Sequence, residues 1–292
     1  IAINGFGRIG RVFLRSVLKH PSIEVVAIND LSSSKTMSHL FKYDSVHRTF
    51  EGKVSYTSDS IVVDDKPIYY SSISEPEKLP WKDLKVDVVL ECTGNFKTKK
   101  LASKHLKAGT NKVIISAPPS DSHIKTIVMG VNNDIIDGTE QILSNASCTT
   151  NSAAPMIQLI NNHLGIESAY ITTIHSYTTD QRLLDNSHKD PRRARSASQS
   201  IVPTSTGASK AIGEIIPSLK GKLEGVAMRV PTPNVSLVEL VFCTKKDLSI
   251  DKINSAFQNF SKKNKILETT KEKLVSIDFN HNPASSIIDE SL

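Results

Sequence analysis

The first ten residues decide the fold of this chain, and they read Ile1-Ala2-Ile3-Asn4-Gly5-Phe6-Gly7-Arg8-Ile9-Gly10. The apolar start predicts a short strand, and the three glycines form the pattern G-x-G-x-x-G at the turn into a helical stretch over residues 8–20. A second predicted strand, residues 24–29, ends at Asp30, which follows Gly10 by 20 residues. A strand, a glycine turn, a helix and a following acid are the context of a dinucleotide-binding fingerprint.

Each part of this fingerprint has a chemical use. Gly5, Gly7 and Gly10 permit a tight turn and a close approach of the backbone to a pyrophosphate, whose charge the N–H groups at the helix start would hold. Asp30 would accept hydrogen bonds from the adenosine ribose and repel a 2′-phosphate, which favours NAD over NADP. The alternative is a glycine-rich turn followed by a solvated acid.

The rest of the first half continues the alternation of strands and helices. Strands are expected at residues 86–92 and 112–116, with a helix over residues 98–108 between them that stops at Gly109. Such alternation predicts a parallel sheet with helices on both faces, a doubly wound α/β fold. Residues 53–70 predict an antiparallel hairpin that turns at Asp64-Asp65.

The second half predicts a different, α+β architecture with a mixed and mostly antiparallel sheet. Longer alternating strands are expected at residues 169–178 and 225–243, and helices at residues 153–164, 208–216 and 250–260. Because a single core rarely exceeds roughly 250–300 residues, the 292 residues predict two domains. We expect a dinucleotide-binding domain over residues 1–147 and a catalytic domain over residues 148–292.

Composition narrows the class of protein. Lys and Arg number 36 against 30 Asp and Glu, and this net charge of +6 suits phosphate ligands or weak contact with nucleic acid. Three cysteines in a chain of this length indicate a reducing compartment. No apolar run approaches the ~18 residues of a membrane span, and no signal peptide is recognisable. We therefore expect a cytoplasmic protein with no membrane contact and no metal site.

Cys148 is the candidate nucleophile, since it lies where a helix is expected to begin. Unpaired N–H groups and the helix dipole at that place stabilise a thiolate and an oxyanion. His175 ends a predicted strand, where it could act as the general base, but spacing alone does not show that the two residues meet. The alternatives are a small buried cysteine, which is the interpretation for Cys92 and Cys243, and a structural histidine.

Arginines mark candidate anion sites. Arg192, Arg193 and Arg195 lie in a polar loop over residues 180–200, and residues 204–207 then offer hydroxyls and backbone N–H groups. Arg229 interrupts an apolar strand, where a buried guanidinium needs a fixed anion such as a carboxylate or a phosphate. The alternative for the loop is a solvated surface or a contact between subunits.

Eight segments together resemble the phosphorylating glyceraldehyde-3-phosphate dehydrogenase family of the bacterial type. They run in collinear order along the whole chain: Ile3–Arg11, Lys42–Ser45, Glu91–Gly94, Ser147–Asn151, His175–Thr178, Arg192–Arg195, Pro203–Ala208 and Arg229–Ser236. The cysteine segment and Pro231-Thr232-Pro233-Asn234 are the most specific.

The resemblance implies a role for each matching residue. Cys148 is then the nucleophile and His175 its base. The implied substrate and phosphate contacts are Ser147, Thr149, Thr206, Gly207 and Arg229, with a second anion pocket formed by Thr178, Asp180 and Arg193. The implied cofactor contacts, besides the three glycines, are Arg8, Ile9, Asp30, Thr93 and Ser116.

The implied reaction oxidises glyceraldehyde 3-phosphate with NAD and transfers the acyl group from Cys148 to inorganic phosphate. NADP is expected as a secondary cofactor, because Asn186-Ser187 replaces the Leu-Pro pair of NAD-specific members. The loop over residues 180–200 resembles the family's loop that reaches a neighbouring subunit, which implies a homotetramer.

Other departures from the family pattern are Ser74, at the place of a cofactor-contacting Arg, and Ser152, at the place of a second cysteine. The family also carries a further strand and a final helix beyond the position of Leu292, which the resemblance implies are missing here. Two alternatives remain open: an erythrose-4-phosphate dehydrogenase, which hydrolyses the thioester, and a non-catalytic protein that binds RNA or a cell-surface partner. No aromatic and basic nucleic-acid motif is present, so no specific nucleic-acid partner is expected.

Overall fold

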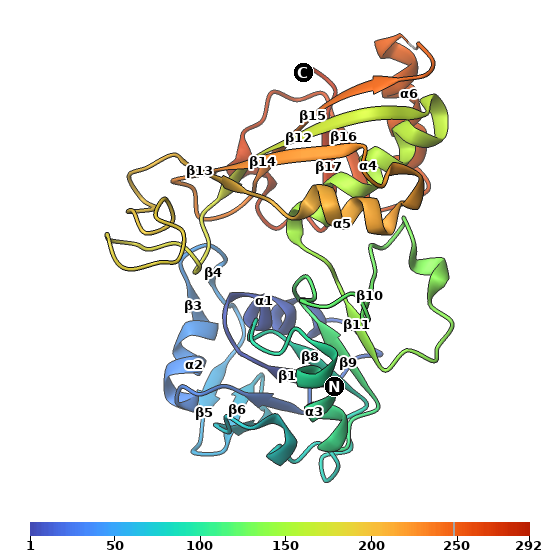
Figure 1. Cartoon of the computed structure of the whole chain (residues 1–292). Coiled ribbons are helices and arrows are strands. Elements are labelled where there is room, and N and C mark those ends of the chain that lie inside the picture. Colours follow the sequence, from blue (N-terminus) through green and yellow to red (C-terminus); the bar gives the residue numbers. More distant parts are fainter. Residues whose placement is uncertain (248) are drawn as a thin grey trace. The chain divides into compact units, whose positions relative to one another are not determined.

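The computed structural model describes residues 1–247 and 249–292, which form two compact units (Figure 1). The first unit comprises residues 1–127 and 134–146, and the second comprises residues 128–133 and 147–292. Short 3₁₀ helices are found at Pro76–Lys78, Asn133–Ile135, Pro217–Leu219 and Ser276–Phe279.

The sheet of the first unit has nine strands in the spatial order β10-β11-β9-β8-β1-β2-β7-β6-β5. In chain order they are β1 (Ala2–Asn4), β2 (Ala27–Asn29), β5 (Val54–Tyr56), β6 (Ser60–Val63), β7 (Lys66–Ser71), β8 (Val88–Glu91), β9 (Lys112–Ile115), β10 (Lys125–Thr126) and β11 (Ile142–Ser144). A separate ladder joins β3 (Tyr43–Asp44) to β4 (Arg48–Thr49). All pairs from β10 to β7 are parallel, and only β6 pairs antiparallel with its neighbours. The order reverses between β1 and β8, where doubly wound sheets bind their ligands.

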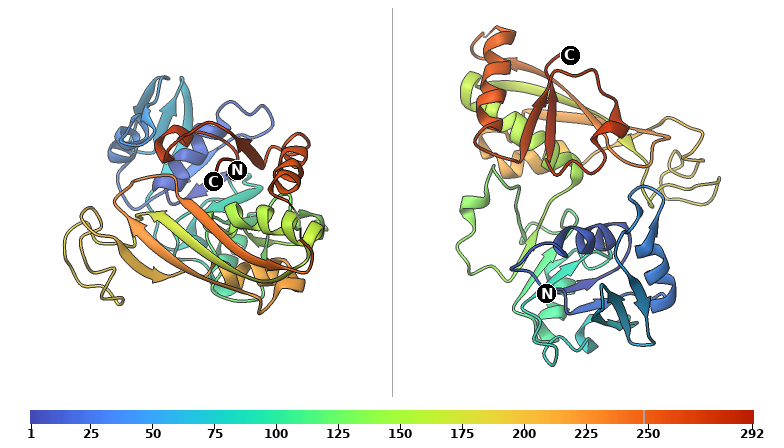
Figure 2. Two further views of the ribbon diagram at one scale, coloured as in Figure 1. Left: turned by 90° about the horizontal axis from the view of Figure 1, so that it is seen from above. Right: turned by 180° about the vertical axis from the view of Figure 1, so that it is seen from behind.

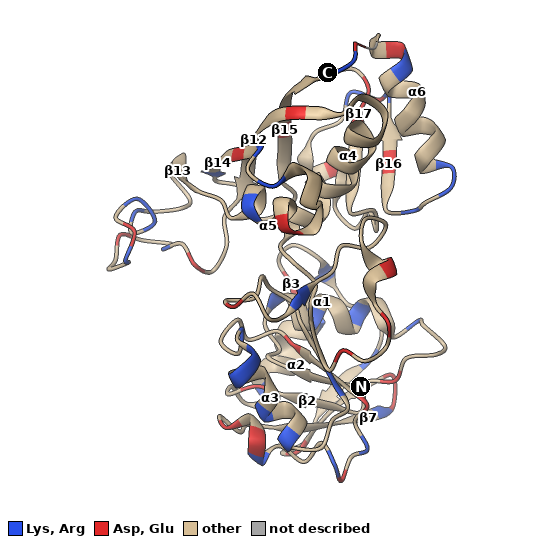
Figure 3. Cartoon of the chain, turned by 45° about the vertical axis from the view of Figure 1, so that its right-hand side comes forward, with Lys and Arg blue, Asp and Glu red and all other residues tan. Residues whose placement is uncertain are grey.

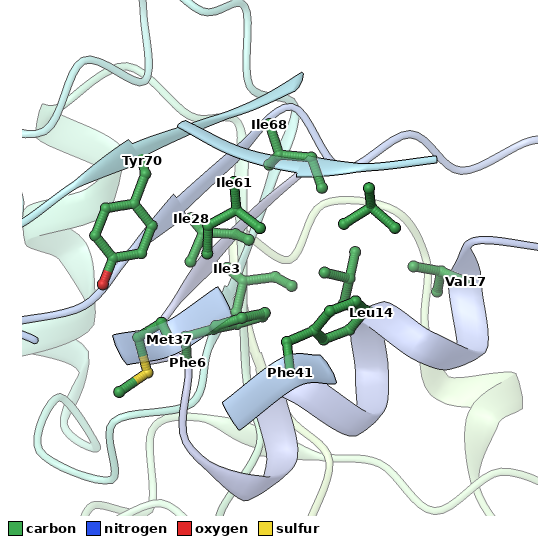
Figure 4. Close-up of a cluster of buried hydrophobic side chains, with 11 residues drawn as sticks. Ile3, Phe6, Leu14, Val17, Ile28, Met37, Phe41, Ile61, Ile68 and Tyr70 are labelled. Atoms are coloured by element: carbon green, nitrogen blue, oxygen red, sulfur yellow. The ribbon is translucent and has the colours of Figure 1, made fainter. Parts of the chain in front are cut away.

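Helices cover both faces of this sheet, as the sequence predicts. Ile3 and Ile28 share one buried cluster with residues of α1 (Arg8–Val17) and α2 (Ser34–Lys42), among them Leu14 and Phe41 (Figure 4). Their chain neighbours Ala2 and Ala27 face the other way, into a cluster with Trp81 and with Ala108 at the end of α3 (Lys99–Lys107). Successive strand residues alternate between two cores, which explains why β1 and β2 carry apolar side chains on both faces.

The second unit is built on the sheet order β13-β14-β12-β15. Its strands are β12 (Ile166–Ser176), β13 (Val202–Ser205), β14 (Leu223–Val230) and β15 (Leu237–Thr244), with a separate parallel pair of β16 (Leu267–Thr270) and β17 (Ser286–Asp289). The pairs β13–β14 and β12–β15 are antiparallel and β12–β14 is parallel, which confirms the predicted mixed sheet. The helices α4 (Cys148–Leu164) and α5 (Ala208–Ile215) pack on one face, with α6 (Ile250–Ser261) beside α4 (Figures 1 and 2).

The structure differs from several expected bounds. The expected strand over residues 225–243 is two strands, because Pro231 and Pro233 lack a backbone N–H and end the regular strand between β14 and β15. Strand β2 starts at Ala27 rather than at residue 24, and α1 ends at Val17 ahead of Pro21. The helix α2 and strand β13 were not predicted, since neither has a clear apolar period.

Other expectations are confirmed. The hairpin of β6 and β7 turns at Asp64 and Asp65, whose φ angles of 48° and 65° suit a tight hairpin turn. All of residues 180–200 are described and none belongs to a helix or strand. This stretch, hereafter the polar loop, carries charges of both signs (Figure 3). Among the described residues, no helix is long and apolar enough to cross a membrane.

Candidate active site and nucleotide-binding loops

Cys148 is the first residue of α4, and the local chemistry fixes it there. The Ser147 side chain caps the helix, because its Oγ accepts a hydrogen bond of 3.1 Å from the Thr150 N–H. Ala146, just before the cap, has a φ of 58°, so the chain turns sharply out of β11 into the helix. The thiol therefore lies at the positive end of a helix of 17 residues.

The register of the sheet brings His175 and Arg229 together. They are Cα partners in the parallel pair of β12 and β14, so their side chains share the face that α4 and α5 cover. His175 is buried, and its Nε2 lies 3.2 Å from the Cys148 Sγ. The structure thus joins the two residues whose meeting the sequence left open.

The surroundings of Cys148 favour its thiolate. Burial by itself raises the pKa of this thiol, but the hydrogen bond and charge of His175 and the N–H and hydroxyl of Thr149 outweigh it, so that the pKa lies below its usual value. The cysteine is nevertheless exposed to solvent, as a nucleophile must be.

The other two cysteines differ from Cys148 and from each other. Cys92, which was expected to be buried, is half-buried against the cluster around Ile3, and burial raises the pKa of its thiol to about 12. The expectation that Cys243 is buried is wrong. It is exposed on β15, because it points away from the face that the helices cover.

We expect iodoacetamide to modify Cys148 at pH 7 roughly tenfold faster than Cys243, and Cys92 to remain unmodified. A lowered pKa increases the thiolate fraction at a given pH, and the rate should fall as the pH drops through that lowered pKa. Mass spectrometry of alkylated peptides between pH 5 and pH 9 measures all three rates. Equal rates for Cys148 and Cys243 would contradict the thiolate assignment.

The Nδ1 atom of His175 has two neighbours with opposite demands. The Ser176 carbonyl oxygen lies 2.6 Å away and can only accept, whereas the Arg229 Nη1 lies 2.7 Å away and can only donate. With the proton on Nδ1, a neutral ring leaves Nε2 free to take a proton near the sulfur. With Nδ1 accepting from Arg229, the Nε2–H instead donates to the thiolate. The site can thus hold either neutral tautomer of His175, in which Nε2 accepts from or donates to the sulfur, and an acid–base group needs both roles.

Arg229 is suited to holding an anion. Burial and the nearby Arg193 lower the pKa of Arg229. They outweigh the charges of Cys148 and Asp180, which raise it, so that the pKa lies below its usual value. Its Nη1 donates to the Ser176 carbonyl at 3.1 Å. Its Nε is buried and has no hydrogen-bond partner among residues 1–247 and 249–292. A guanidinium with an unused donor in this position matches a phosphate oxygen.

The polar loop supplies a second basic site. Arg193 makes a very short hydrogen bond to Asp180 and donates through Nε to the Thr204 Oγ1 at 3.0 Å, with Asp190 3.6 Å away. Burial raises the pKa of Asp180, but Arg193 and His188 bring it below the usual range. Asp180 therefore orients the guanidinium of Arg193 by accepting a hydrogen bond from it.

The remaining expected contacts occupy helix starts and turns. Thr149 is buried in the first turn of α4, and Gly207 precedes α5, where the Thr206 Oγ1 accepts from the Ala208 N–H at 3.2 Å. No hydrogen bond among the described residues joins Thr206 or Gly207 to Cys148.

The Thr178 N–H donates to Oε1 of Gln181 at 3.1 Å. Sequence reasoning missed Gln181, because a glutamine in a polar loop gives no sign that it is buried.

In the first unit, the glycine loop joins β1 to α1. Gly5 has a φ of 92°, and a Cβ there would lie 2.7 Å from the Thr93 nitrogen. A Cβ on Gly10 would lie 2.3 Å from the Gly5 oxygen, so the helix can pack on the turn only without a side chain. Beside Gly7 the space is open, and α1 begins without a side-chain cap or an acidic residue in its first turn. These features leave N–H groups for a pyrophosphate.

The other expected cofactor residues lie at the carboxyl ends of neighbouring strands. Asp30 follows β2, and its two carboxylate oxygens accept from the Phe6 N–H at 2.8 Å and the Ser32 N–H at 3.0 Å. Thr93 follows β8 and Ser116 follows β9. Arg8 and Ile9 open α1, and Ile9 is 56% exposed although it is apolar. No group of three metal-binding side chains occurs within the part of the chain that the structure describes.

A doubly wound sheet with a dinucleotide loop, together with a paired cysteine and histidine at a helix start, defines a dehydrogenase that works through a thiol. Comparison with known proteins gives the family. Residues 1–99 match the glyceraldehyde 3-phosphate dehydrogenase NAD binding domain, and residues 147–292 match the C-terminal domain of the same enzyme. The chain belongs to the glyceraldehyde-3-phosphate dehydrogenase family.

Similar proteins cover nearly the whole chain. It is 50% identical over 99% of its length to the glyceraldehyde-3-phosphate dehydrogenase of Geobacillus stearothermophilus, and 49% identical over its full length to that of Clostridium pasteurianum. In both cases the match covers 87% of the relative. The resemblance and the fold class expected from the sequence are confirmed. The chain is an NAD-dependent oxidoreductase with the family's activity on glyceraldehyde 3-phosphate, and NAD is its cofactor.

Proposed function

We propose that Cys148 and His175 are the residues with which this chain oxidises glyceraldehyde 3-phosphate and passes its acyl group to inorganic phosphate, giving 1,3-bisphosphoglycerate. The observation that carries this assignment is the 3.2 Å contact between Sγ at the start of α4 and Nε2 at the end of β12. A thiolate held there can attack an aldehyde carbon, and the helix N–H groups stabilise the oxygen.

The steps follow from these two groups. The Cys148 sulfur attacks the aldehyde to give a thiohemiacetal, and His175 Nε2 removes the proton of its hydroxyl as the carbon loses a hydride. NAD, when bound, supplies the acceptor for that hydride. Inorganic phosphate then attacks the thioester carbon, which releases the Cys148 thiolate and the acyl phosphate.

Two anion pockets serve this sequence in our proposal. Arg229, with its unused Nε donor, binds one phosphate group together with Ser147, Thr149, Thr206 and Gly207. Arg193 binds the other beside Thr178, held in place by Asp180. One pocket takes the phosphate of the substrate, and the other takes the attacking phosphate.

For the cofactor, we propose that Gly5, Gly7 and Gly10 hold the pyrophosphate over the start of α1. Asp30 binds the ribose hydroxyls, and the remaining contacts come from Arg8, Ile9, Thr93 and Ser116. The open space beside Gly7 and the uncapped helix start support this placing.

The test is spectrophotometric reduction of NAD with glyceraldehyde 3-phosphate, with and without inorganic phosphate. We expect turnover that depends on phosphate and far lower turnover of erythrose 4-phosphate. Equal turnover in the absence of phosphate would instead indicate hydrolysis of the thioester.

We expect Asp30→Asn to raise kcat/KM for NADP by about tenfold and to lower that for NAD only severalfold. A carboxylate near a 2′-phosphate costs about 1–4 kcal/mol at 4 Å, depending on the effective dielectric. Asparagine removes the charge but keeps one oxygen as acceptor for Phe6 or Ser32. Steady-state kinetics with both cofactors measures the effect, and Asp59→Asn, on the distant turn between β5 and β6, is the matched control. A wild-type preference for NADP would refute the role given to Asp30.

We propose further that residues 1–147 form the dinucleotide-binding domain and residues 148–292 the catalytic domain, that the protein works in the cytoplasm, and that it assembles as a homotetramer. All three cysteines are unpaired, which suits a reducing compartment. The face of the second sheet away from α4 and α5 exposes Tyr170 beside its strand partner Val241, and Leu237 on the same face of β15. Large apolar side chains exposed on a sheet face support self-association. Analytical ultracentrifugation would show a species of four chains, and a monomer would refute the assembly.

A further inference from the structure

A row of buried polar side chains crosses the carboxyl edge of the first sheet, and none of them has a part in the proposed chemistry. Ser71, Asn29, Asn4 and Glu91 are the last residues of β7, β2, β1 and β8, and each is the Cα partner of the next. All four are at most 7% exposed. Such a row is costly to bury unless its groups bond one another.

The hydrogen bonds of this row all run toward Glu91. The Ser71 Oγ donates to the Asn29 Oδ1 at 2.9 Å, the Asn29 Nδ2 donates to the Asn4 Oδ1 at 2.8 Å, and the Asn4 Nδ2 donates to the Glu91 Oε2 at 2.6 Å. Each amide thus has one orientation, fixed by its neighbours on both sides.

A second set of donors reaches Glu91 from the opposite direction. The indole N–H of Trp81 can only donate, and it lies 3.1 Å from the His105 Nδ1. The proton of the neutral imidazole is therefore on Nε2, which donates to the Glu91 Oε2 at 3.1 Å. Trp81 and His105 are completely buried, so their orientations are fixed by packing as well.

The other oxygen of Glu91 holds the loop after β8. Oε1 accepts from the Thr93 N–H at 2.7 Å and makes a very short hydrogen bond with the Thr93 hydroxyl. Four donors therefore fill the carboxylate, whose two oxygens have about four acceptor positions. The charge is satisfied by neutral donors, and every one of them points to a fixed place.

We infer that Glu91 is a positioning residue for the dinucleotide, which holds the Thr93 loop against the glycine loop. The row reaches three loops of the proposed cofactor site, since Asn4 precedes Gly5, Asn29 precedes Asp30, and Glu91 bonds Thr93 directly. The backbones of Gly5 and Thr93 are so close that a Cβ on Gly5 would clash with the Thr93 nitrogen. A shift of the Thr93 loop therefore also disturbs the pyrophosphate turn. This inference rests on the proposed placing of NAD at these loops.

Glu91→Gln tests the inference with almost no change in volume. A glutamine turns an NH₂ group toward one of the two pairs of donors, so either Thr93 or the pair of Asn4 and His105 loses its acceptor. We expect the Kd for NAD, measured by calorimetry, to rise roughly 10- to 100-fold, as for loss of hydrogen bonds to a charged group. The kcat at saturating NAD should stay within about threefold of wild type, because Glu91 touches no reacting atom.

Thr110→Val is the matched control for lost stability. Thr110 is buried in the same unit, but it precedes β9 at the opposite edge of the sheet, where its hydroxyl donates to the Asp87 carbonyl at 3.0 Å. We expect this variant to lower the Tm without changing the Kd for NAD. If Glu91→Gln lowers the Tm and leaves the Kd within twofold of wild type, as the control does, the inference is overturned.

Trp81→Phe disturbs the hydrogen bonds of the Glu91 carboxylate from outside the loops. It tests the inference if Glu91→Gln does not fold. It leaves Nδ1 of His105 without its donor, and we expect a severalfold higher Kd for NAD at unchanged kcat. An unchanged Kd in this variant would then count against the inference. If the wild-type chain does not bind NAD, both the proposed cofactor site and the inference on Glu91 are overturned. If the wild type binds NAD and the variants bind it equally well, only the inference on Glu91 is overturned.

Discussion

Replacement of Cys148 by serine should lower kcat for phosphate-dependent oxidation of glyceraldehyde 3-phosphate by at least about 10⁴-fold. A serine hydroxyl is not ionised near neutral pH, even at a helix start beside His175. An ester formed on it would also react with phosphate far more slowly than a thioester does. The helix N–H groups and the capping Ser147 remain in place, so the expected loss concerns chemistry and not folding. Initial rates of NADH formation measure it.

Cys243→Ser is the control for this experiment. Cys243 is exposed on β15 and also loses a sulfur on replacement, yet its side chain lies on the face of the sheet away from α4. We expect wild-type activity from this variant and equal Tm values for both variants. Substantial turnover by Cys148→Ser would mean that the reaction does not pass through a covalent intermediate on this residue.

The fingerprint of the first unit could be predicted because its signals are local. The strand before Gly5, the open helix start after Gly7 and the acid that ends the next strand all follow within 30 residues. The tight contact of Gly10 with the Gly5 oxygen is a consequence of one turn, so the glycine pattern alone indicates it. Cys148 was recognisable for the same reason, since it closely precedes the local helical pattern of residues 153–164, although the helix begins at Cys148 itself.

The rest of the site depends on contacts between distant segments. His175 reaches Cys148 only because α4 packs on one face of β12, and Arg229 joins them through the register of β12 with β14. A shift of one residue in that register would turn Arg229 to the other face. The exposure of Cys243 and the burial of Gln181 likewise depend on which face the helices cover. The donors to Glu91 come from three separate places in the chain, Asn4, Thr93 and His105, so no single motif reveals them.

Removal of the base should have the next largest effect. We expect His175→Asn to lower kcat by about 10²- to 10⁴-fold, the usual contribution of a positioned acid–base group. Asparagine is short and retains a polar group near the Ser176 carbonyl and Arg229, but nothing in its place reaches the Cys148 sulfur as Nε2 does. The thiohemiacetal proton would then pass to solvent, which slows the hydride step.

The pH dependence separates this role from a structural one. His175 lowers the pKa of Cys148, so without it that pKa should rise, because burial of the thiol is no longer outweighed. In the variant the thiolate then forms at higher pH. Both the alkylation rate of Cys148 and the residual activity should therefore increase toward alkaline pH. Over the same pH range the alkylation rate of the wild type should already be constant. His163→Asn, an exposed change in the last turn of α4, should leave the profile unaltered. If His175→Asn reduces activity but the alkylation profile of Cys148 keeps its wild-type midpoint, the histidine does not act on the thiol.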